Sequence, residues 1–212
     1  SNRVDQNIRR PDTEEVQNQV DTAHSEQEAY GCCRDEGDDL ISAKLTGCED
    51  DLVIISLKGK AIRFSETDLR DQGRATRGVR GIRLAEGDEA KAMEVVNPEG
   101  TLLICGLNGQ GKRTKFEEYP VQKRGGSGVI AARTTGVSGA LTVFETDEMM
   151  MLTKNGQAVR TRVADISVIG RATKGVRCIN LNEGDRLLGV ARIVDVGEDD
   201  GDSGEEGGEA GS

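Results

Sequence analysis

The chain has 212 residues, of which 35 % are hydrophobic and 2 % aromatic, and its formal net charge at pH 7 is −10. So few aromatic residues argue against a module that stacks nucleic-acid bases on a sheet or in a groove. Five cysteines without a CxxC pair, together with one histidine, argue against a zinc site and fit the thiols of a reducing cytoplasm. No apolar stretch approaches the length of a membrane span and no signal-peptide pattern is present, so we expect no membrane partner.

The negative charge is concentrated at the two ends of the chain. Residues 1–50 carry 5 Lys and Arg against 13 Asp and Glu, and residues 193–212 carry none against 8. Residues 51–192 carry 23 against 17 and are therefore basic. A basic body between acidic flanks predicts a polyanionic partner, and the acidic tail can compete with that partner for the basic surface. The alternative is a tail that only increases solubility.

In chain order, residues 1–34 are polar and predict a weakly ordered segment. From about residue 35 the sequence becomes a repeat with a period of roughly fifty residues, which predicts an array of supersecondary units. We place a partial unit at 35–50 and complete units at 51–96, 97–145 and 146–196, followed by an acidic, disordered tail at 197–212. The chain starts with Ser-Asn rather than Met, and the first unit lacks its front half, so we expect a fragment.

Each unit has the same sequence of short runs. A β-branched or apolar run leads into a Lys-Gly or Asn-Gly turn and a second run follows it, which predicts a hairpin. Nineteen residues after each turn glycine comes a second glycine. In the first and third units this glycine is followed by residues 79–84 and 176–181, whose apolar and polar side chains alternate as in a half-buried strand. A Gly-Asp turn then leads to a last strand, except in the middle unit, where we expect a different turn around Gly136. Four strands per unit predict an all-β, propeller-like array of four-stranded blades, about three complete plus a partial one.

Basic residues recur at fixed offsets in the units. Those around the hairpin turns are Lys58, Lys60, Arg63, Lys112, Arg113 and Arg160, and those before the second glycines are Arg74, Arg77, Lys123, Arg124, Arg171 and Lys174. Glycine lets a backbone approach a phosphate, while Lys and Arg supply charge and hydrogen bonds. These contacts select the DNA backbone rather than a base sequence. The alternative is an ordinary Gly-rich turn with solvated cations, but three loops at corresponding positions favour binding.

Over residues 35–196 the repeat resembles the C-terminal domain of the DNA gyrase A protein and that of its topoisomerase IV relative. The stretches that carry the resemblance are Gly111–Thr114 with Glu118–Pro120, Gln157–Val163 with Ile166, and Val168–Arg177. The resemblance implies a β-pinwheel whose blades exchange strands and whose basic rim wraps duplex DNA, in support of ATP-dependent negative supercoiling by the whole enzyme. The acidic tail and the regular blades favour gyrase over topoisomerase IV.

One motif departs from the family pattern. The family's diagnostic heptad reads Gln-Arg-Arg-Gly-Gly-Lys-Gly in its first blade, whereas Gln122–Gly128 has Lys123 at the second place and Ser127 at the sixth. We therefore interpret Gln122–Gly128 as a related loop of a later blade, with the true heptad upstream of this chain.

The resemblance also predicts partners and a place in the cell. It implies duplex DNA and, through an upstream region, the gyrase B protein in an A2B2 heterotetramer, in the cytoplasm and associated with the nucleoid. ATP and Mg would belong to the gyrase B protein and to upstream domains, so we expect no cofactor and no catalytic residue in this chain, and Tyr119 is expected to pack at a strand end. The rival hypothesis is a propeller-like protein-interaction scaffold. A third hypothesis, that the chain is an enzyme, finds no Ser-His-Asp, Cys-His or phosphate-loop constellation in the sequence to support it.

Overall fold

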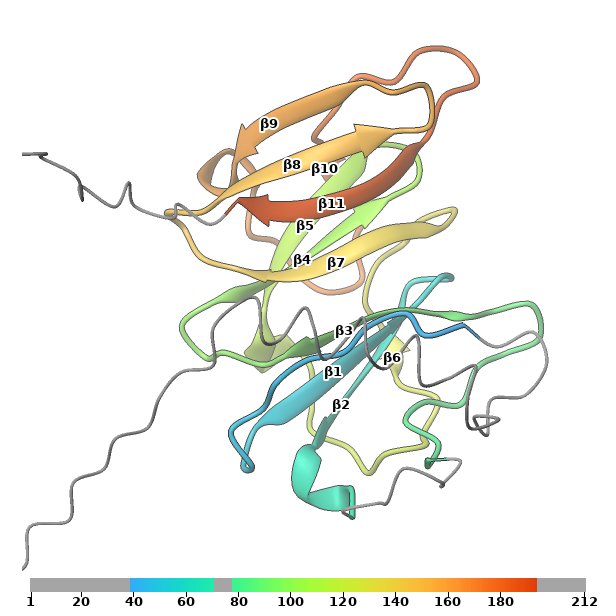
Figure 1. The fold of residues 1–212 in the computed structure, drawn as a ribbon, viewed down its shortest axis with the longest axis vertical. Helices are drawn as coiled ribbons and strands as arrows, with labels where there is room; N and C mark the ends of the chain where they lie inside the picture. Colours follow the sequence, from blue (N-terminus) through green and yellow to red (C-terminus); the bar gives the residue numbers. More distant parts are fainter. Residues whose placement is uncertain (1–38, 71–77, 194–212) are drawn as a thin grey trace, which may run out of the picture. The chain divides into compact units, whose positions relative to one another are not determined.

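The computed structural model describes residues 39–70 and 78–193 (Figure 1). The strands are β1 (Asp51–Ser56), β2 (Lys60–Ser65), β3 (Ala90–Val95), β4 (Thr101–Gly106), β5 (Gln110–Lys115), β6 (Val129–Ile130), β7 (Val137–Val143), β8 (Glu148–Thr153), β9 (Ala158–Arg162), β10 (Val176–Arg177) and β11 (Leu187–Ile193). Three short 3-10 helices follow the hairpins, namely η1 (Glu66–Asp68), η2 (Phe116–Glu118) and η3 (Val163–Asp165). The expectations for residues 1–34, for the tail at 197–212 and for Arg74 and Arg77 lie outside the described residues.

The three predicted hairpins are confirmed. β1 pairs with β2, β4 with β5 and β8 with β9, all antiparallel and with the same register relative to the turn glycine. Gly59, Gly109 and Gly156 at the tips have φ of +78°, +74° and +85°, in the left-handed region that glycine enters without steric cost. The hairpin sequence therefore predicts both the strands and the turn between them.

The outer strand of a sheet comes from the following unit. The sheet orders are β3-β1-β2-β6, β7-β4-β5-β10 and β11-β8-β9, so that β6 and β10 each join the sheet of the unit before their own. This is the strand exchange that the resemblance implied.

The expectation of continuous strands over 79–84 and 176–181 is wrong. Residues 79–84 form no strand, and only Val176 and Arg177 pair. The ladder stops because the next two amides, those of Cys178 and Ile179, both donate to the carbonyl of Gly109, at 2.9 and 3.3 Å. Two donors that share one acceptor turn the chain away from the sheet edge.

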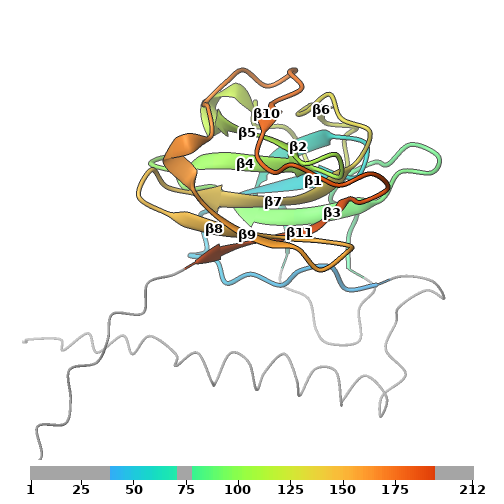
Figure 2. The same ribbon diagram turned by 90° about the horizontal axis from the view of Figure 1, so that it is seen from above.

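The core lies between successive sheets. Alternate residues of a central strand point to opposite faces, so Leu102 and Ile104 of β4 pack in one apolar cluster with Val53 and Ile55 of β1. Leu103 and Cys105 of the same strand pack in a second cluster with Met149, Met151 and Leu187. Strands β3, β7 and β11 contact in that order, with β7 between the other two (Figures 1 and 2). Each fully buried aliphatic side chain contributes about 1.5–3 kcal/mol, so stacking of sheets supplies most of the stability.

The turn before the last strand differs in the middle unit, as the sequence predicts. In the first and third units Gly87 and Gly184 have φ of +64° and +77°. The aspartates that follow them accept hydrogen bonds from the hairpin turns, Asp88 Oδ1 from Lys58 N at 2.9 Å and Asp185 Oδ1 from Asn155 N at 3.1 Å. In the middle unit Thr134 Oγ1 instead accepts from Gly136 N at 3.3 Å, which closes a different turn.

Candidate nucleic-acid interface

The two described cationic loops lie against the outer segment of the preceding unit. In the first, Gly125 N donates to Gly81 O at 2.6 Å and Arg83 N donates to Gly126 O at 2.8 Å. In the second, Arg133 N donates to Thr173 O at 2.9 Å. Strand exchange therefore places a basic loop beside an exposed arginine of the preceding unit at both positions.

The first loop keeps its positive charge. Arg124 donates from Nε to Asp68 O at 3.1 Å and from Nη1 to Arg80 O at 3.4 Å, while Lys123 is exposed. Backbone carbonyls orient a guanidinium through their dipoles but do not neutralise it, as a carboxylate would. No described carboxylate forms an ion pair with Lys123 or Arg124.

The second loop is built in the same way and has an internal anchor. Arg171 Nη1 donates to Ile130 O at 2.9 Å, and Lys174 is exposed. Beneath the loop Lys112, only 1 % exposed, donates from Nζ to Gly170 O at 3.0 Å, to Arg171 O, and to Thr173 Oγ1 at 3.3 Å. Burial, with the charge of Arg171 beside it, lowers the pKa of Lys112 to about 8. Lys112 thus fixes the loop from inside and does not reach its surface.

The arginine four positions after each turn glycine connects consecutive units. Arg63 donates from Nε to Asp51 Oδ2 at 2.8 Å and from Nη1 to Phe116 O of the next unit at 2.9 Å. We interpret it as a structural connection rather than a surface group. Lys58 is occupied as well, because its Nζ donates to Glu86 O at 2.6 Å, and Lys60 is half-buried in β2.

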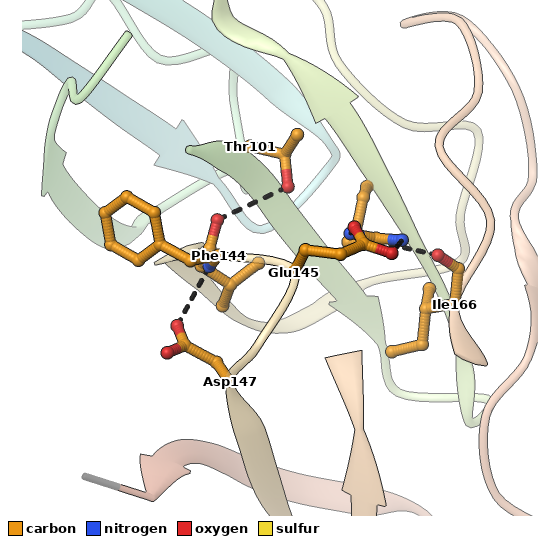
Figure 3. Close-up of polar contacts among 7 residues, drawn as sticks. Thr101, Phe144, Glu145, Asp147 and Ile166 are labelled. Carbon is orange, nitrogen blue, oxygen red and sulfur yellow. Dashed lines mark hydrogen bonds and ion pairs between the residues drawn. The ribbon is translucent and has the colours of Figure 1, made fainter. Parts of the chain in front are cut away.

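Arg113 makes the same connection between the second and third units, and its partners Glu145 and Ile166 are labelled in Figure 3. It is 3 % exposed, and its Nε donates to Ile166 O at 2.7 Å while its Nη1 pairs with Glu145. This guanidinium holds the pKa of the Glu145 carboxyl below its ordinary value. Next to Glu145 in the chain, Phe144 N donates to Asp147 Oδ2 at 2.9 Å. Arg160, at the corresponding position of the third unit, pairs with Glu148, and its side chain is 61 % exposed.

Among the described residues with reactive side chains, Tyr119 and Cys105 are buried, Cys178 is half-buried and Cys48 is exposed. Tyr119 is packed in the cluster between the first two sheets, and burial raises its pKa to about 12. Burial also raises the pKa of the Cys105 and Cys178 thiols. Residues 39–70 and 78–193 contain no cluster of His, Cys, Asp and Glu that could hold a metal ion. Over the same ranges, no helix has the length and apolar character needed to span a membrane.

The structure thus divides the predicted cations into two groups. Lys123, Arg124, Arg171 and Lys174 lie in corresponding loops, while most of the hairpin cations bind oxygen atoms of their own or the next unit, namely Lys58, Arg63, Lys112, Arg113 and Arg160. Lys60 is half-buried in β2. Sequence reasoning missed Arg83 and Arg133, which the loops contact. The signal was available, because each arginine lies five residues after the second glycine of its unit.

A family model described as the DNA gyrase C-terminal domain, beta-propeller, matches residues 50–97, 100–136 and 147–193. The chain belongs to the DNA gyrase A C-terminal domain family. Each of the three matched ranges of this gyrase domain contains one of the three hairpins of the structure.

Relatives of the gyrase family agree with this membership. The DNA gyrase A protein of Mycolicibacterium smegmatis is 43 % identical over 169 residues, in a match that covers 77 % of this chain and 20 % of that protein. The DNA gyrase A protein of Escherichia coli K12 is 42 % identical over 173 residues, in a match that covers 79 % of this chain and 20 % of that protein. The chain therefore spans about a fifth of the length of these curated relatives.

Solved structures of the family have the same fold. The structure of a DNA gyrase A C-terminal domain superposes with a TM-score of 0.71 at 30 % identity, covering 76 % of this chain and 56 % of that one. The C-terminal domain of DNA topoisomerase IV superposes with a TM-score of 0.70 at 22 % identity, covering 75 % of this chain and 52 % of that one, and shows the fold alone.

Proposed function

We propose that this chain binds duplex DNA through its cationic loops and bends it, as the DNA-wrapping part of a gyrase A protein. The observation that supports the proposal is the repeated construction of the loops. In successive units the same backbone positions hold arginine through carbonyl oxygens, so the charge is oriented but not neutralised. A fixed and unpaired guanidinium with a flexible lysine beside it is well suited to bind a phosphate.

The chemistry of the loops favours recognition of the phosphate backbone over recognition of bases. Lys123, Arg124, Arg171 and Lys174 offer only charged donors. In addition, Phe116 and Tyr119 are buried, so neither offers a ring for base stacking. Binding of this kind is independent of sequence and loses affinity steeply with salt, because each neutralised phosphate releases counterions. Corresponding loops on consecutive units offer a duplex successive points of attachment, and several such points favour a bent path over a straight one.

The activity of a whole gyrase extends this proposal. The two gyrase A relatives share 43 % and 42 % identity with the chain. On that basis we place the chain in a gyrase A protein that assembles with the gyrase B protein in the bacterial cytoplasm, on the nucleoid. Strand passage and ATP hydrolysis would then belong to other parts of that assembly.

The experiment compares two variants with equal changes in net charge. The loop variant reverses Lys123, Arg124, Arg171 and Lys174 to Glu, and the control variant reverses Lys154, Arg162, Arg186 and Arg192, which are exposed but lie outside the loops. The loop variant should lose about 100-fold or more in affinity for duplex DNA at low salt, and the slope of log affinity against log salt should fall by about 3–4.

The control variant should retain the affinity of the parent within a few fold, and both variants should keep the circular dichroism of the parent. Equal losses in the two variants would show that net charge alone governs binding, and the loop proposal would then be wrong.

A further inference from the structure

Each cationic loop leaves the edge of a sheet and returns to the same edge. Before the first loop, Val121 forms a parallel bridge with Arg63 of β2, and Gln122 N donates to Arg63 O at 2.8 Å. After the loop, Ile130 of β6 lies opposite Lys60 of the same strand. Both ends of the first loop are therefore fixed on β2, and the residues between them project from the sheet edge.

The second loop is held on β5 in the same way. Before it, Val168 forms a parallel bridge with Arg113. After it, Arg177 of β10 lies opposite Gln110. Figure 2 shows β6 and β10, the strands that directly follow the loops, on the same side of the molecule. The two loops therefore project from one side of the stacked sheets.

Exposed apolar side chains border both loops. Val121 and Val168 occupy the same position in consecutive units and are 57 % and 43 % exposed, and Ile130 is 46 % exposed. A single exposed apolar residue needs no explanation. Here, however, the exposure recurs at one position of the repeat. Each of the three residues also lies at the end of a loop whose cations form no ion pair with a described carboxylate.

These side chains lie next to the oriented arginines. Arg171 Nη1 donates to Ile130 O at 2.9 Å, which places the guanidinium beside Ile130. Val168 precedes Arg171 by three residues, as Val121 precedes Arg124 in the first loop. Three residues of extended chain span at most about 10 Å. Each valine therefore lies close to any group that the arginine of its loop binds.

The combination of oriented charge and apolar surface matches the backbone of DNA. A DNA strand alternates phosphate groups with deoxyriboses, and the carbon atoms of the sugar form the apolar part of that backbone. A phosphate on Arg171 would bring the attached sugar to the side chains of Ile130 and Val168. An acidic protein segment could also pair with the cations, but it has no apolar group that recurs at a fixed distance from every charge.

We propose that Val121, Ile130 and Val168 contact the deoxyriboses of a duplex whose phosphates are held by the cationic loops. Such contacts rest on the proposed function, DNA binding by the loops, and add to it a part of the affinity that does not depend on salt. Neutralised phosphates release counterions, so their contribution falls as the salt concentration rises. Apolar contacts release water instead, and contacts to sugars carry no sequence information.

The experiment uses a loop-border variant that combines Val121→Thr, Ile130→Thr and Val168→Thr. Threonine keeps the β-branched shape and removes apolar surface, and none of the three residues belongs to the buried core. Affinity for duplex DNA is measured over a salt series. The variant should bind about 10-fold more weakly at every salt concentration, with the slope of log affinity against log salt unchanged. Lys174→Gln, which removes a charge, should instead lower that slope by about 1.

Two further variants serve as controls. The first replaces Leu45, Leu152 and Leu188 by Thr, since these residues are at least as exposed, at 70 %, 47 % and 47 %, but lie outside the loops and their borders. It should keep the DNA affinity of the parent. The second replaces Val121, Ile130 and Val168 by Leu, which retains apolar surface at the loop borders, and its affinity should stay within about 2-fold of the parent.

The outcomes distinguish the sugar contacts from the proposed function. Unchanged affinity of the loop-border variant, or an equal loss in the first control, would overturn the contacts while the salt-steep binding of the parent still supported the proposed function. A loss with a shallower salt slope would mean that the substitutions disturb the loop cations, and it would overturn the contacts as well. A parent that does not bind DNA at low salt would overturn both.

Discussion

Replacing Arg113 by alanine tests whether this arginine joins the second and third units. Arg113 and Arg160 stand at the same position of consecutive hairpins, and both pair with a glutamate. They differ in burial, because Arg113 is packed against the third unit whereas the side chain of Arg160 is 61 % exposed. Arg160→Ala is therefore a matched control for Arg113→Ala.

The expected cost of Arg113→Ala comes from three sources. The carbonyl of Ile166, a buried residue, loses its donor, which costs about 1–3 kcal/mol. Loss of the buried aliphatic stem costs about 1–2 kcal/mol. The ion pair itself adds little, because the Glu145 side chain is 68 % exposed and solvent screens its charge. The free energy of unfolding should fall by about 3–4 kcal/mol for Arg113→Ala, and by no more than about 1 kcal/mol for Arg160→Ala.

Urea denaturation followed by circular dichroism measures both values. The slope of the free energy against urea should not change, so that the midpoints report stability directly. Losses that differ by less than about 1 kcal/mol between the two variants would refute the idea that arginine at this position joins the units.

Three further predictions follow from the same contacts. Because Lys112 has a folded-state pKa of about 8 against an ordinary 10.5, the unfolded chain binds more protons between these values. Its own contribution to stability should therefore rise from about pH 8 to pH 10. The buried thiols of Cys105 and Cys178, whose pKa values are raised from an ordinary 9.0, lower stability above about pH 9 in parent and variant alike. The difference in free energy of unfolding between the parent and Lys112→Met in a urea series should therefore shift in favour of the parent over this range. Gly128→Ala should destabilise the fold by about 2 kcal/mol more than Gly184→Ala in thermal unfolding, because its Cβ would lie 2.4 Å from a backbone oxygen of β2, while that of Gly184 meets nothing. Deleting residues 197–212 should tighten DNA binding at low salt in a mobility-shift titration, and an unchanged affinity would limit the acidic tail to solubility.

The hairpins could be predicted from the sequence because local chemistry determines them. A β-branched or apolar run that leads into an Asn-Gly or Lys-Gly turn predicts a hairpin, and this held at all three positions. The altered turn of the middle unit was visible for the same reason, as Gly136 stands where the other units have Gly-Asp.

The length of the outer strands could not be predicted in the same way. Residues 176–181 alternate as a strand does, yet pairing ends after Arg177, because the next two amides share the carbonyl of Gly109, which belongs to the preceding unit. Nothing in the local sequence specifies an acceptor that distant. An alternation pattern reports which side chains face inward but not where a ladder stops.

The sequence also did not show which basic side chains would be buried between units and which would be exposed. Arg113 and Arg160 stand at the same offset from their turn glycines and each precedes a threonine, and only the unit packed against Arg113 makes one of them buried. Arg124 and Arg171 were recognisable from their glycine-rich loops, whereas the carbonyls that hold them, those of Asp68 and Ile130, come from elements far away in the chain.

The most direct test of the account is the binding of the chain to a duplex of about 150 base pairs over a salt series, with energy transfer between the two DNA ends recorded in the same samples. The account predicts an affinity that falls steeply with salt and DNA ends that move closer together on binding. Salt-steep binding without any approach of the ends would contradict wrapping, and no binding at low salt would contradict the assignment of the cationic loops to DNA.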